Sequence, residues 1–452
     1  MKKSIIPHFS GCNWTRAIHL FLYGPQQQRP FQESQSLYYC TILLLFWACG
    51  LYGQTAFNPN LLPLGEEEAL LANTGTARSG STGAVFYNPA GLSTVEGTSF
   101  SLSGSAYTLS HFEAQPLEVL YGEELHYSGS GYQTIPTSFI IARKMGEWRV
   151  AFSVLIPMQF RFEGTQAWRV PLADDVLDVR VLQYYREKMS LTGITLSKPI
   201  NETWSWGVSV FSQYYTFTSQ LDFTSQTENN TDFYLRSTER IRLNPTNLMI
   251  VGGLMHHGDR LDWGLRIALP SFHLFGRGDY YFEQYARVPN EEVQREVVET
   301  GRVRAQFTTP LDIRWGLQLA LNPKWNASLD LSYGNHTEFQ VFDSPAIDFR
   351  EQVRNSVRIS TGWERIFNER FSGFAGLSYM PTDLSTDAGL TADAFQYSSV
   401  SVGGKFSTQQ VRSIIGVYFA FGQSNTRREI GPDVWREHFY YLGGFIGTQY
   451  AF

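Results

Sequence analysis

The residues that could do chemistry are nine histidines and the carboxylates near them. His256 and His257 stand beside Asp259, a set that could bind a metal ion but more often forms a solvated turn. Other histidines lack a serine or carboxylate at a spacing typical of a hydrolase: His111, His126, His336 and His438. No glycine-rich phosphate loop is present. We therefore expect no catalytic residues, no metal site and no cofactor, and we predict that the protein is not an enzyme.

The first 53 residues read as an extension and a secretory signal peptide. The apolar run at 41–52 is too short to span a bilayer and is followed by small residues. Cleavage after Gly53 would start the mature chain at Gln54. Cys49 raises the alternative of a lipoprotein anchor, but the residues before it make a poor lipobox.

The three cysteines, Cys12, Cys40 and Cys49, all precede the predicted cleavage site. The exported chain would therefore have no disulfide, no thiolate nucleophile and no cysteine metal site.

The composition favours a membrane protein that is not a helical bundle. Aromatic residues make up 15% of the chain and charged residues 17%, whereas soluble proteins carry about 25% charged residues. The mean hydropathy of −0.22 excludes several membrane helices. A net charge of −6 without a basic tract argues against a nucleic-acid partner.

Alternating apolar and polar residues define the elements that must position any site. Between Asp312 and Leu321, every second residue is large and apolar, and the same pattern runs from Trp325 to Tyr333. The two segments are joined by a tight turn at 322–324, which predicts a β-hairpin.

Extending this reading predicts an all-β fold, a transmembrane antiparallel β-barrel of about 14 strands over residues 98–452. Segments 261–275 and 301–321 are each read as one strand. Connections alternate between tight periplasmic turns and long outer loops, such as those near Gly122 and Ala173. A soluble sandwich is the alternative, but six tryptophans near strand ends favour a membrane barrel: Trp204, Trp206, Trp263, Trp315, Trp325 and Trp363.

Residues 54–97 differ from the rest because they are rich in small residues and lack sustained alternation. A segment of this size cannot bury a core of its own. We expect it to pack inside the barrel lumen as a plug. Glycines in the strands, Gly207, Gly253, Gly264 and Gly316, would let its backbone approach the wall, or would equally mark bulges.

Within this segment, a small-residue run at 75–80 precedes Asn88-Pro89-Ala90-Gly91-Leu92. An ordinary turn would explain these residues alone. Together with the strands that follow, they resemble the FadL family of outer-membrane transporters for long-chain fatty acids and other hydrophobic compounds. The resemblance implies that residues 54–97 are a periplasmic or luminal hatch and that Asn88, Pro89 and Ala90 are the Asn-Pro-Ala box that the hatch carries in this family.

The third predicted strand contains Pro157, which cannot donate to a strand ladder and fits at a bulge or an edge. In the FadL family this strand is kinked and opens a lateral exit, so the resemblance implies a wall kink at Pro157. No glycine follows Pro157 here, and a simple β-bulge is the equal alternative.

The last strand alternates and ends on the aromatic residue Phe452. Such an end is typical of Gram-negative outer-membrane barrels, so we expect Phe452 to be the terminal signal for the barrel-assembly machinery and outer-membrane lipid to surround the protein.

The resemblance predicts passive uptake of a hydrophobic ligand such as a long-chain fatty acid. Burial of each CH₂ contributes about 0.8 kcal/mol, so capture needs no ATP. Two alternatives stay open: a FadL-like barrel that acts in protein secretion or surface assembly, and a non-specific porin for small polar solutes.

Overall fold

The computed structural model describes residues 64–452 except 121–122, 173–174, 230–232, 289–291, 346, 348, 354, 382–395 and 427–434. The expected signal peptide lies outside the described residues, so the division of the chain at residue 53 stays a prediction.

Antiparallel strands make up most of the described chain. Their bounds are β1 Thr98–Leu120, β2 Glu123–Met145, β3 Trp148–Pro171, β4 Val176–Pro199, β5 Trp204–Thr227, β6 Tyr234–His256, β7 Leu261–Ala268, β8 Phe272–Arg287, β9 Gln294–Arg304, β10 Asp312–Asn322, β11 Trp325–Gly334, β12 Thr337–Gln340, β13 Arg350–Val353, β14 Ser356–Ile366, β15 Phe371–Pro381, β16 Gln396–Ser407, β17 Val411–Thr426 and β18 Trp435–Ala451.

Fourteen of these strands close into a barrel. The ring runs from β1 to β6, continues through β7, β10, β11 and β14 to β18, and closes where β18 pairs with β1. The predicted fold class is therefore confirmed. β8 and β9 extend the sheet beside the upper part of β6, and β12 and β13 form a small separate hairpin.

Two segments that the sequence pattern reads as single strands are broken. Residues 261–275 divide into β7 and β8, and residues 301–321 divide into β9 and β10. Pro270 and Pro310 lie in the two breaks, where a missing N–H cannot continue a ladder. Ser271 N donates to Thr309 O at 3.0 Å, so the two breaks lie side by side. The expectation of continuous strands here was wrong.

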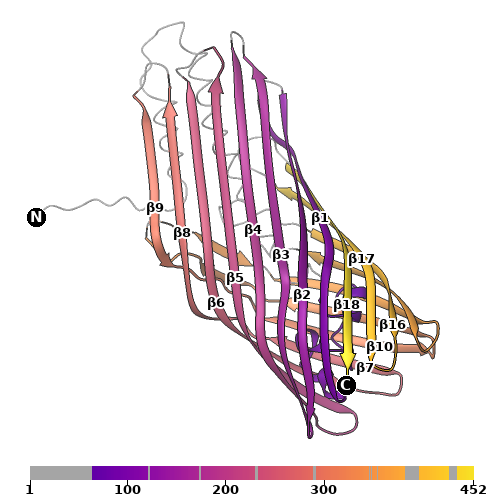
Figure 1. The fold of residues 1–452 in the computed structure, drawn as a ribbon. Helices are drawn as coiled ribbons and strands as arrows, with labels where there is room; N and C mark the ends of the chain where they lie inside the picture. Colours follow the sequence, from indigo (N-terminus) through magenta and orange to yellow (C-terminus); the bar gives the residue numbers. More distant parts are fainter. Residues whose placement is uncertain are drawn as a thin grey trace, which may run out of the picture.

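The strands on one side of the barrel are much longer than a membrane crossing needs. β1 to β6 each have 23 or 24 residues, whereas about 9 to 11 cross a bilayer. Figure 1 shows them rising as a tall wall above the barrel. The loops expected near Gly122 and Ala173 fall on residues outside the described part of the chain; the flanking strands end at Leu120 and Pro171 and resume at Glu123 and Val176.

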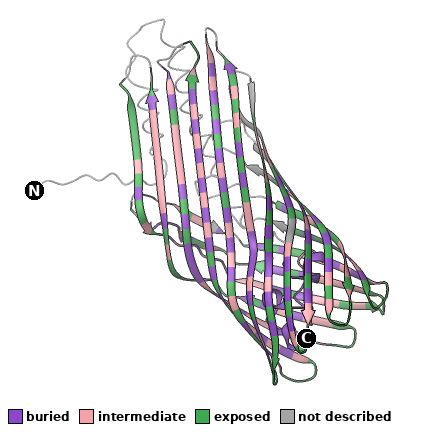
Figure 2. Cartoon of the chain, in the orientation of Figure 1, coloured by how far each residue is buried: buried purple, intermediate pink, exposed green. Residues whose placement is uncertain are grey.

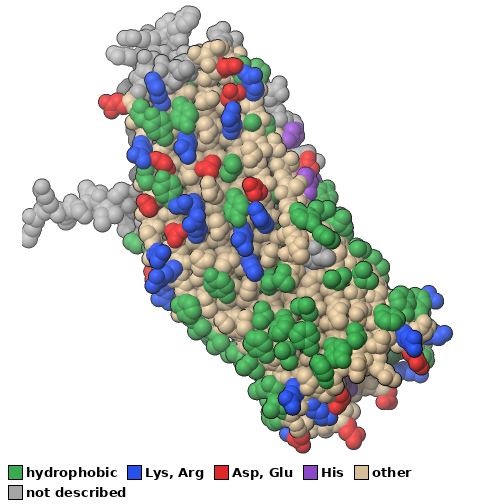
Figure 3. Space-filling view, viewed as in Figure 1, with side chains coloured by type: hydrophobic (Ala, Val, Ile, Leu, Met, Phe, Trp, Pro, Cys, Tyr) green, Lys and Arg blue, Asp and Glu red, His purple; other side chains and the backbone are tan. Residues whose placement is uncertain are grey.

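Buried and exposed residues alternate along the strands (Figure 2). Outward positions carry exposed apolar side chains, among them Phe100, Leu102, Phe152, Ile194, Val210, Trp315, Val402, Ile415 and Ile446. Figure 3 shows hydrophobic side chains gathered over the lower part of the molecule. None of the described helices has the length and apolar character to cross a membrane.

Candidate functional site

Residues 64–97, called here the N-terminal segment, lie against the inner wall of the barrel. They form three short elements, α3 Glu67–Leu70, α4 Ala84–Tyr87 and η1 Pro89–Thr94. Most of their side chains are buried. The segment approaches strands on opposite sides of the ring, since η1 packs on β4, β5 and β6 while α3 packs on β15, β16 and β17.

Asn88 fixes the segment to this wall with both atoms of its amide. Its Oδ1 accepts from Ala90 N at 3.1 Å and caps η1, whereas its Nδ2 donates to Thr76 O at 2.7 Å and to Leu254 O of β6 at 3.1 Å. Pro89 takes the first position of η1, where its missing N–H costs nothing. Asn88-Pro89-Ala90 is thus a local cap that also binds the wall.

The carbonyl of Ala90 continues this attachment. It accepts from Ser205 Oγ of β5 at 3.1 Å and from Ser197 Oγ of β4 at 3.3 Å. The three residues of the box therefore contact β4, β5 and β6 together.

Glycines on the inner face let the segment's backbone come close. A Cβ at Gly207 would lie 2.5 Å from Pro89 C, and one at Gly316 would lie 2.6 Å from Thr76 Cβ. The same holds for Gly253 and Gly264, so all four wall glycines have the close-approach role rather than marking bulges.

Buried charges hold the other side of the segment. Arg78 pairs with Glu67 of the segment and with Glu364 of β14, and Lys405 of β16 pairs with Glu67 at 2.7 Å and with Glu364 at 3.3 Å. Asp330 of β11 accepts from the N–H groups of Gly75 and Thr76 at 3.0 and 3.1 Å and from Thr76 Oγ1 at 2.7 Å. Inward charges that lipid would reject are thus bound to the segment or to one another.

Two carboxyls of the segment are held away from water. Burial raises the pKa of Glu66 from 4.5 to about 7, and the charge of nearby Glu68 adds to the rise, although the hydrogen bonds that Ser101 and Thr82 donate to Glu66 lower it. Burial also raises the pKa of Glu68. The seated segment therefore favours the protonated forms of these two groups.

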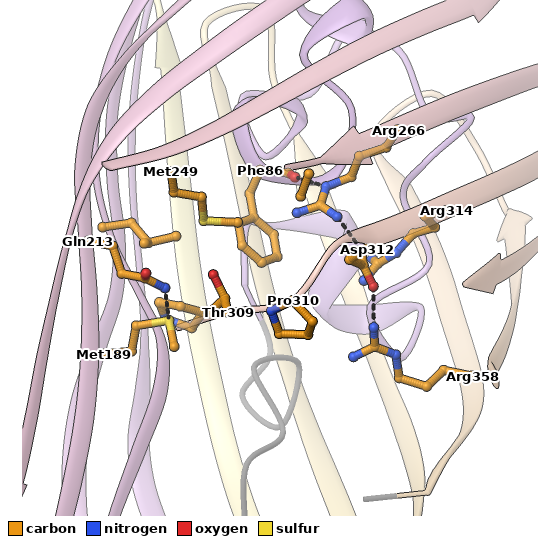
Figure 4. Close-up of a pocket in the computed structure, with 13 residues that line it drawn as sticks. Phe86, Met189, Gln213, Met249, Arg266, Thr309, Pro310, Asp312, Arg314 and Arg358 are labelled. Atoms are coloured by element: carbon orange, nitrogen blue, oxygen red, sulfur yellow. Dashed lines mark hydrogen bonds and ion pairs between the residues drawn. The ribbon is translucent and has the colours of Figure 1, made fainter. Parts of the chain in front are cut away.

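A cavity of about 40 Å³ lies between the N-terminal segment and the wall. One side is apolar, with Phe86 of the segment, Met189 and Leu191 of β4, Met249 of β6 and Pro157 of β3. Figure 4 shows Phe86, Met189 and Met249 together on this side, and Thr309 and Pro310 beside them.

The other side of the cavity is charged. Arg266, Arg314 and Arg358 line it with one carboxylate, Asp312, which pairs with Arg266 and Arg358. Figure 4 shows these pairs facing the apolar side. Arg314 also lies over the ring of Tyr87, 5.8 Å from its centroid. Arg314 also interacts with the buried carboxylate of Asp330, so three guanidinium groups face two carboxylates, and the net positive charge suits this side of the cavity to an anion.

Pro157 lies at an irregular point of the wall. The β3–β4 register shifts between Leu155 and Met158, which is the bulge expected at a proline. The β2–β3 ladder is also interrupted, because no paired residues lie between Ser138↔Leu155 and Ser130↔Glu163. Side chains bridge this interruption, where Gln159 Nε2 donates to Gln133 Oε1 at 3.2 Å.

The remaining candidate residues lie apart from the cavity. Phe452 is 78% exposed and its N–H donates to Thr98 O at 2.9 Å, where β18 meets β1. His256 ends β6, and His257 Nε2 lies 3.4 Å from Ser205 Oγ. Asp262, rather than Asp259, is the carboxylate that interacts with His257.

Alternation along β7, β10 and β14 is enough to place Arg266, Arg314 and Arg358 on inward faces, but it does not group them with Phe86, Met189 and Met249. Alternation assigns each residue to the inner or the outer face of its strand. The cavity depends in addition on which residues of different strands lie at the same height in the barrel. That register is not readable from one strand at a time.

No protein-family model and no curated protein matches the chain by sequence. Solved structures do match. A Pseudomonas aeruginosa FadL homologue is 11% identical, with a TM-score of 0.59 over 86% of this chain and 98% of that chain. The Pseudomonas putida toluene transporter TodX is 12% identical, with a TM-score of 0.60 over 87% and 99%. The Ralstonia pickettii toluene transporter TbuX is 14% identical, with a TM-score of 0.55 over 87% and 99%.

The TM-scores establish a shared fold, whereas sequence identities this low do not identify the ligand. The match covers nearly the full length of each neighbour. The resemblance stated from the sequence is therefore confirmed for the fold: the chain has the β-barrel fold of FadL and its structural relatives.

Proposed function

We propose that the protein resides in the Gram-negative outer membrane and takes up hydrophobic molecules passively, with an acidic amphiphile such as a long-chain fatty acid as its ligand. The observation that supports this proposal is the two-sided cavity. Phe86, Met189 and Met249 form its apolar side, and Arg266, Arg314 and Arg358 form its cationic side. The first side is chemically suited to burying an acyl chain and the second to pairing with a carboxylate, and the cavity of about 40 Å³ must widen before a whole chain enters. The fold shared with a FadL homologue and two toluene transporters supports the general class.

In this proposal the N-terminal segment is the hatch. Phe86 belongs both to the segment and to the cavity lining, so movement of the segment would change the size of the cavity. The contacts of Asn88 and Arg78 with the wall are polar and can be exchanged for water one by one. Ligand entry and hatch movement are thereby coupled through Phe86.

The wall at Pro157 is the proposed exit. Pro157 lines the cavity and also stands beside the interrupted β2–β3 ladder. An apolar ligand that moves sideways there would enter lipid without crossing water.

Binding measurements test the ligand class. Calorimetry of the purified protein in detergent with oleic acid and with oleyl alcohol separates chain burial from carboxylate recognition. We expect saturable binding of both, with tighter binding of the acid. Absence of saturable binding for both compounds would overturn the proposal.

The porin alternative predicts a large, steady conductance in planar bilayers. The N-terminal segment, which touches the wall on opposite sides of the ring, argues for a low conductance instead. A role in secretion or surface assembly stays an alternative, and co-purification with secretion components would favour it.

A further inference from the structure

A group of basic side chains lies on the outer face of the wall, directly above its apolar band. Its members are outward-facing residues of β3, β4, β6, β8 and β9: Arg161, Arg186, Lys188, Arg242, Arg277 and Arg304. We call them the basic belt. Figure 3 shows lysine and arginine side chains above the region covered by hydrophobic side chains.

Strand register places these residues on two neighbouring levels. Arg161, Arg186, Thr218 and Arg242 are successive partners across β3, β4, β5 and β6. The second level lies two residues nearer the apolar band. It contains Lys188 of β4 and the pair Arg277 and Arg304, which are partners across β8 and β9. With strands about 4.8 Å apart, the belt from β3 to β8 is roughly 20 Å wide.

The apolar band begins immediately below. Tyr214 of β5 is 45% exposed and Phe275 of β8 is 65% exposed, and both face outward next below the belt. Exposed Ile194 and Val210, partners across β4 and β5, follow further down the wall. Aromatic side chains above an apolar band mark the interface of a membrane barrel, so the belt stands at the height of lipid headgroups.

Carboxylates do not balance the belt. Glu163 lies 3.5 Å from Arg161, and Asp279 is the strand partner of Arg242. Within the described parts of the chain, no ion pair involves Arg186, Lys188, Arg277 or Arg304. This surplus of positive charge stands on a chain whose net charge is −6.

Two pairs within the belt set like charges directly opposite each other. Arg161 faces Arg186 across β3 and β4, and Arg277 faces Arg304 across β8 and β9. Directly opposed like charges destabilise a sheet unless something neutralises them. An anion between the two guanidinium groups of each pair would convert the repulsion into two charge-assisted hydrogen-bond contacts.

We infer that the basic belt binds the phosphate groups of lipids in the outward-facing leaflet. A phosphorylated lipid satisfies both parts of the surface, because its acyl chains cover the apolar band and its headgroup phosphates reach the arginines above. The inference rests on the membrane location in the proposed function but not on the cavity or its ligand.

Native mass spectrometry of the full-length protein in neutral detergent provides the test, with bisphosphorylated lipid A as the probe and its fully dephosphorylated form as the comparison. The test variant carries Arg186→Gln and Arg242→Gln. A matched control carries Arg180→Gln and Arg236→Gln, which are exposed outward residues six positions higher on the same two strands, β4 and β6.

We expect the test variant to lose lipid A affinity about tenfold or more and the control to keep the affinity of the unchanged protein. Equal retention by the test variant and the control, or equal retention of the dephosphorylated lipid, would overturn the inference. Inorganic phosphate is added as a competitor, and displacement of lipid A by it at millimolar concentration would also count against a lipid-specific site.

Oleic acid binding is measured on the same samples. The belt lies outside the barrel, so its variant should bind oleic acid normally. If the unchanged protein retains lipid A but does not bind oleic acid, the proposed uptake function is wrong and the inference about the basic belt still holds.

Discussion

Gly253 of β6 lies directly against Asn88. A Cβ at position 253 would overlap Asn88 Oδ1, the atom that caps η1, and would lie 2.9 Å from Pro89 Cδ and 3.0 Å from Ala90 N. The adjacent Gly252 faces outward, and a Cβ there has no atom nearer than 3.9 Å. The N-terminal segment therefore packs against the inner face of β6 at a position where only glycine leaves enough room.

Gly253→Ala should loosen the N-terminal segment at a cost of about 1 to 3 kcal/mol, because overpacking of a closely packed contact forces atoms apart. We expect more frequent open events in planar bilayers than for the unchanged protein. Gly252→Ala is the matched control and should conduct like the unchanged protein. Identical traces for the two variants would show that the segment does not obstruct the lumen.

Conductance should also depend on pH through Glu66. Its pKa is about 7 when buried and 4.5 when solvated, so below pH 4.5 both seated and released segments carry the proton. As pH rises from 4.5 to 7 the released form ionises first, and seating loses up to roughly 3 kcal/mol. Open events should therefore be more frequent at pH 8 than at pH 5.

Glu66→Gln should reduce this pH response, with the remainder due to Glu68, whose pKa burial also raises. Glu96→Gln is the control, because Glu96 is exposed and Lys144 and Arg149 lower its pKa. A response that Glu66→Gln leaves unchanged would assign the pH dependence to another group.

The sequence pattern was sufficient for the closed barrel because alternation is local. Residues 312–321 and 325–333 could be assigned to strands and faces from their own order, and the turn at 322–324 fixed their pairing. The breaks at Pro270 and Pro310 were missed because apolar residues continue the alternation on both sides of each proline. There the missing backbone donor outweighed the pattern.

The site was only partly accessible from the sequence for a different reason. Asn88, Pro89 and Ala90 stood out as a contiguous group, whereas the cavity draws Phe86, Met189 and Arg358 from segments far apart in the chain. Their proximity depends on the register of several ladders and on where the segment packs, and neither is encoded in a single stretch.

Arg358→Gln should distinguish an acid from an alcohol of equal length. Arg358 lines the cavity and pairs with Asp312, which keeps Arg266 as a second partner in the variant. Loss of one charged hydrogen-bond donor should weaken oleic acid binding roughly tenfold to a hundredfold and leave oleyl alcohol nearly unchanged. Calorimetry with both compounds measures the ratio. An equal loss for both would indicate a folding defect rather than carboxylate recognition.

The lateral exit makes a prediction that separates binding from transport. Gln133 and Gln159 bridge the interrupted β2–β3 ladder through their side chains and through the Gln159 carbonyl, which accepts from Gln133 Nε2 at 3.5 Å, so a covalent link there should hold the gap closed. All three cysteines of the chain lie before the predicted cleavage site after Gly53, so in protein expressed from Gln54 onward Gln133→Cys and Gln159→Cys can be joined by a flexible bismaleimide.

We expect the joined protein to bind oleic acid normally, because neither residue lines the cavity, and to transfer it into the surrounding lipid much more slowly in vesicles. The control pair is Arg143→Cys with Val150→Cys, outward neighbours in the intact ladder near the β2–β3 turn, where a link adds nothing to existing pairing. Unchanged transfer in the Gln133–Gln159 protein would mean that the ligand leaves through the lumen, past the N-terminal segment, and that the irregularity at Pro157 is a bulge without a role in transport.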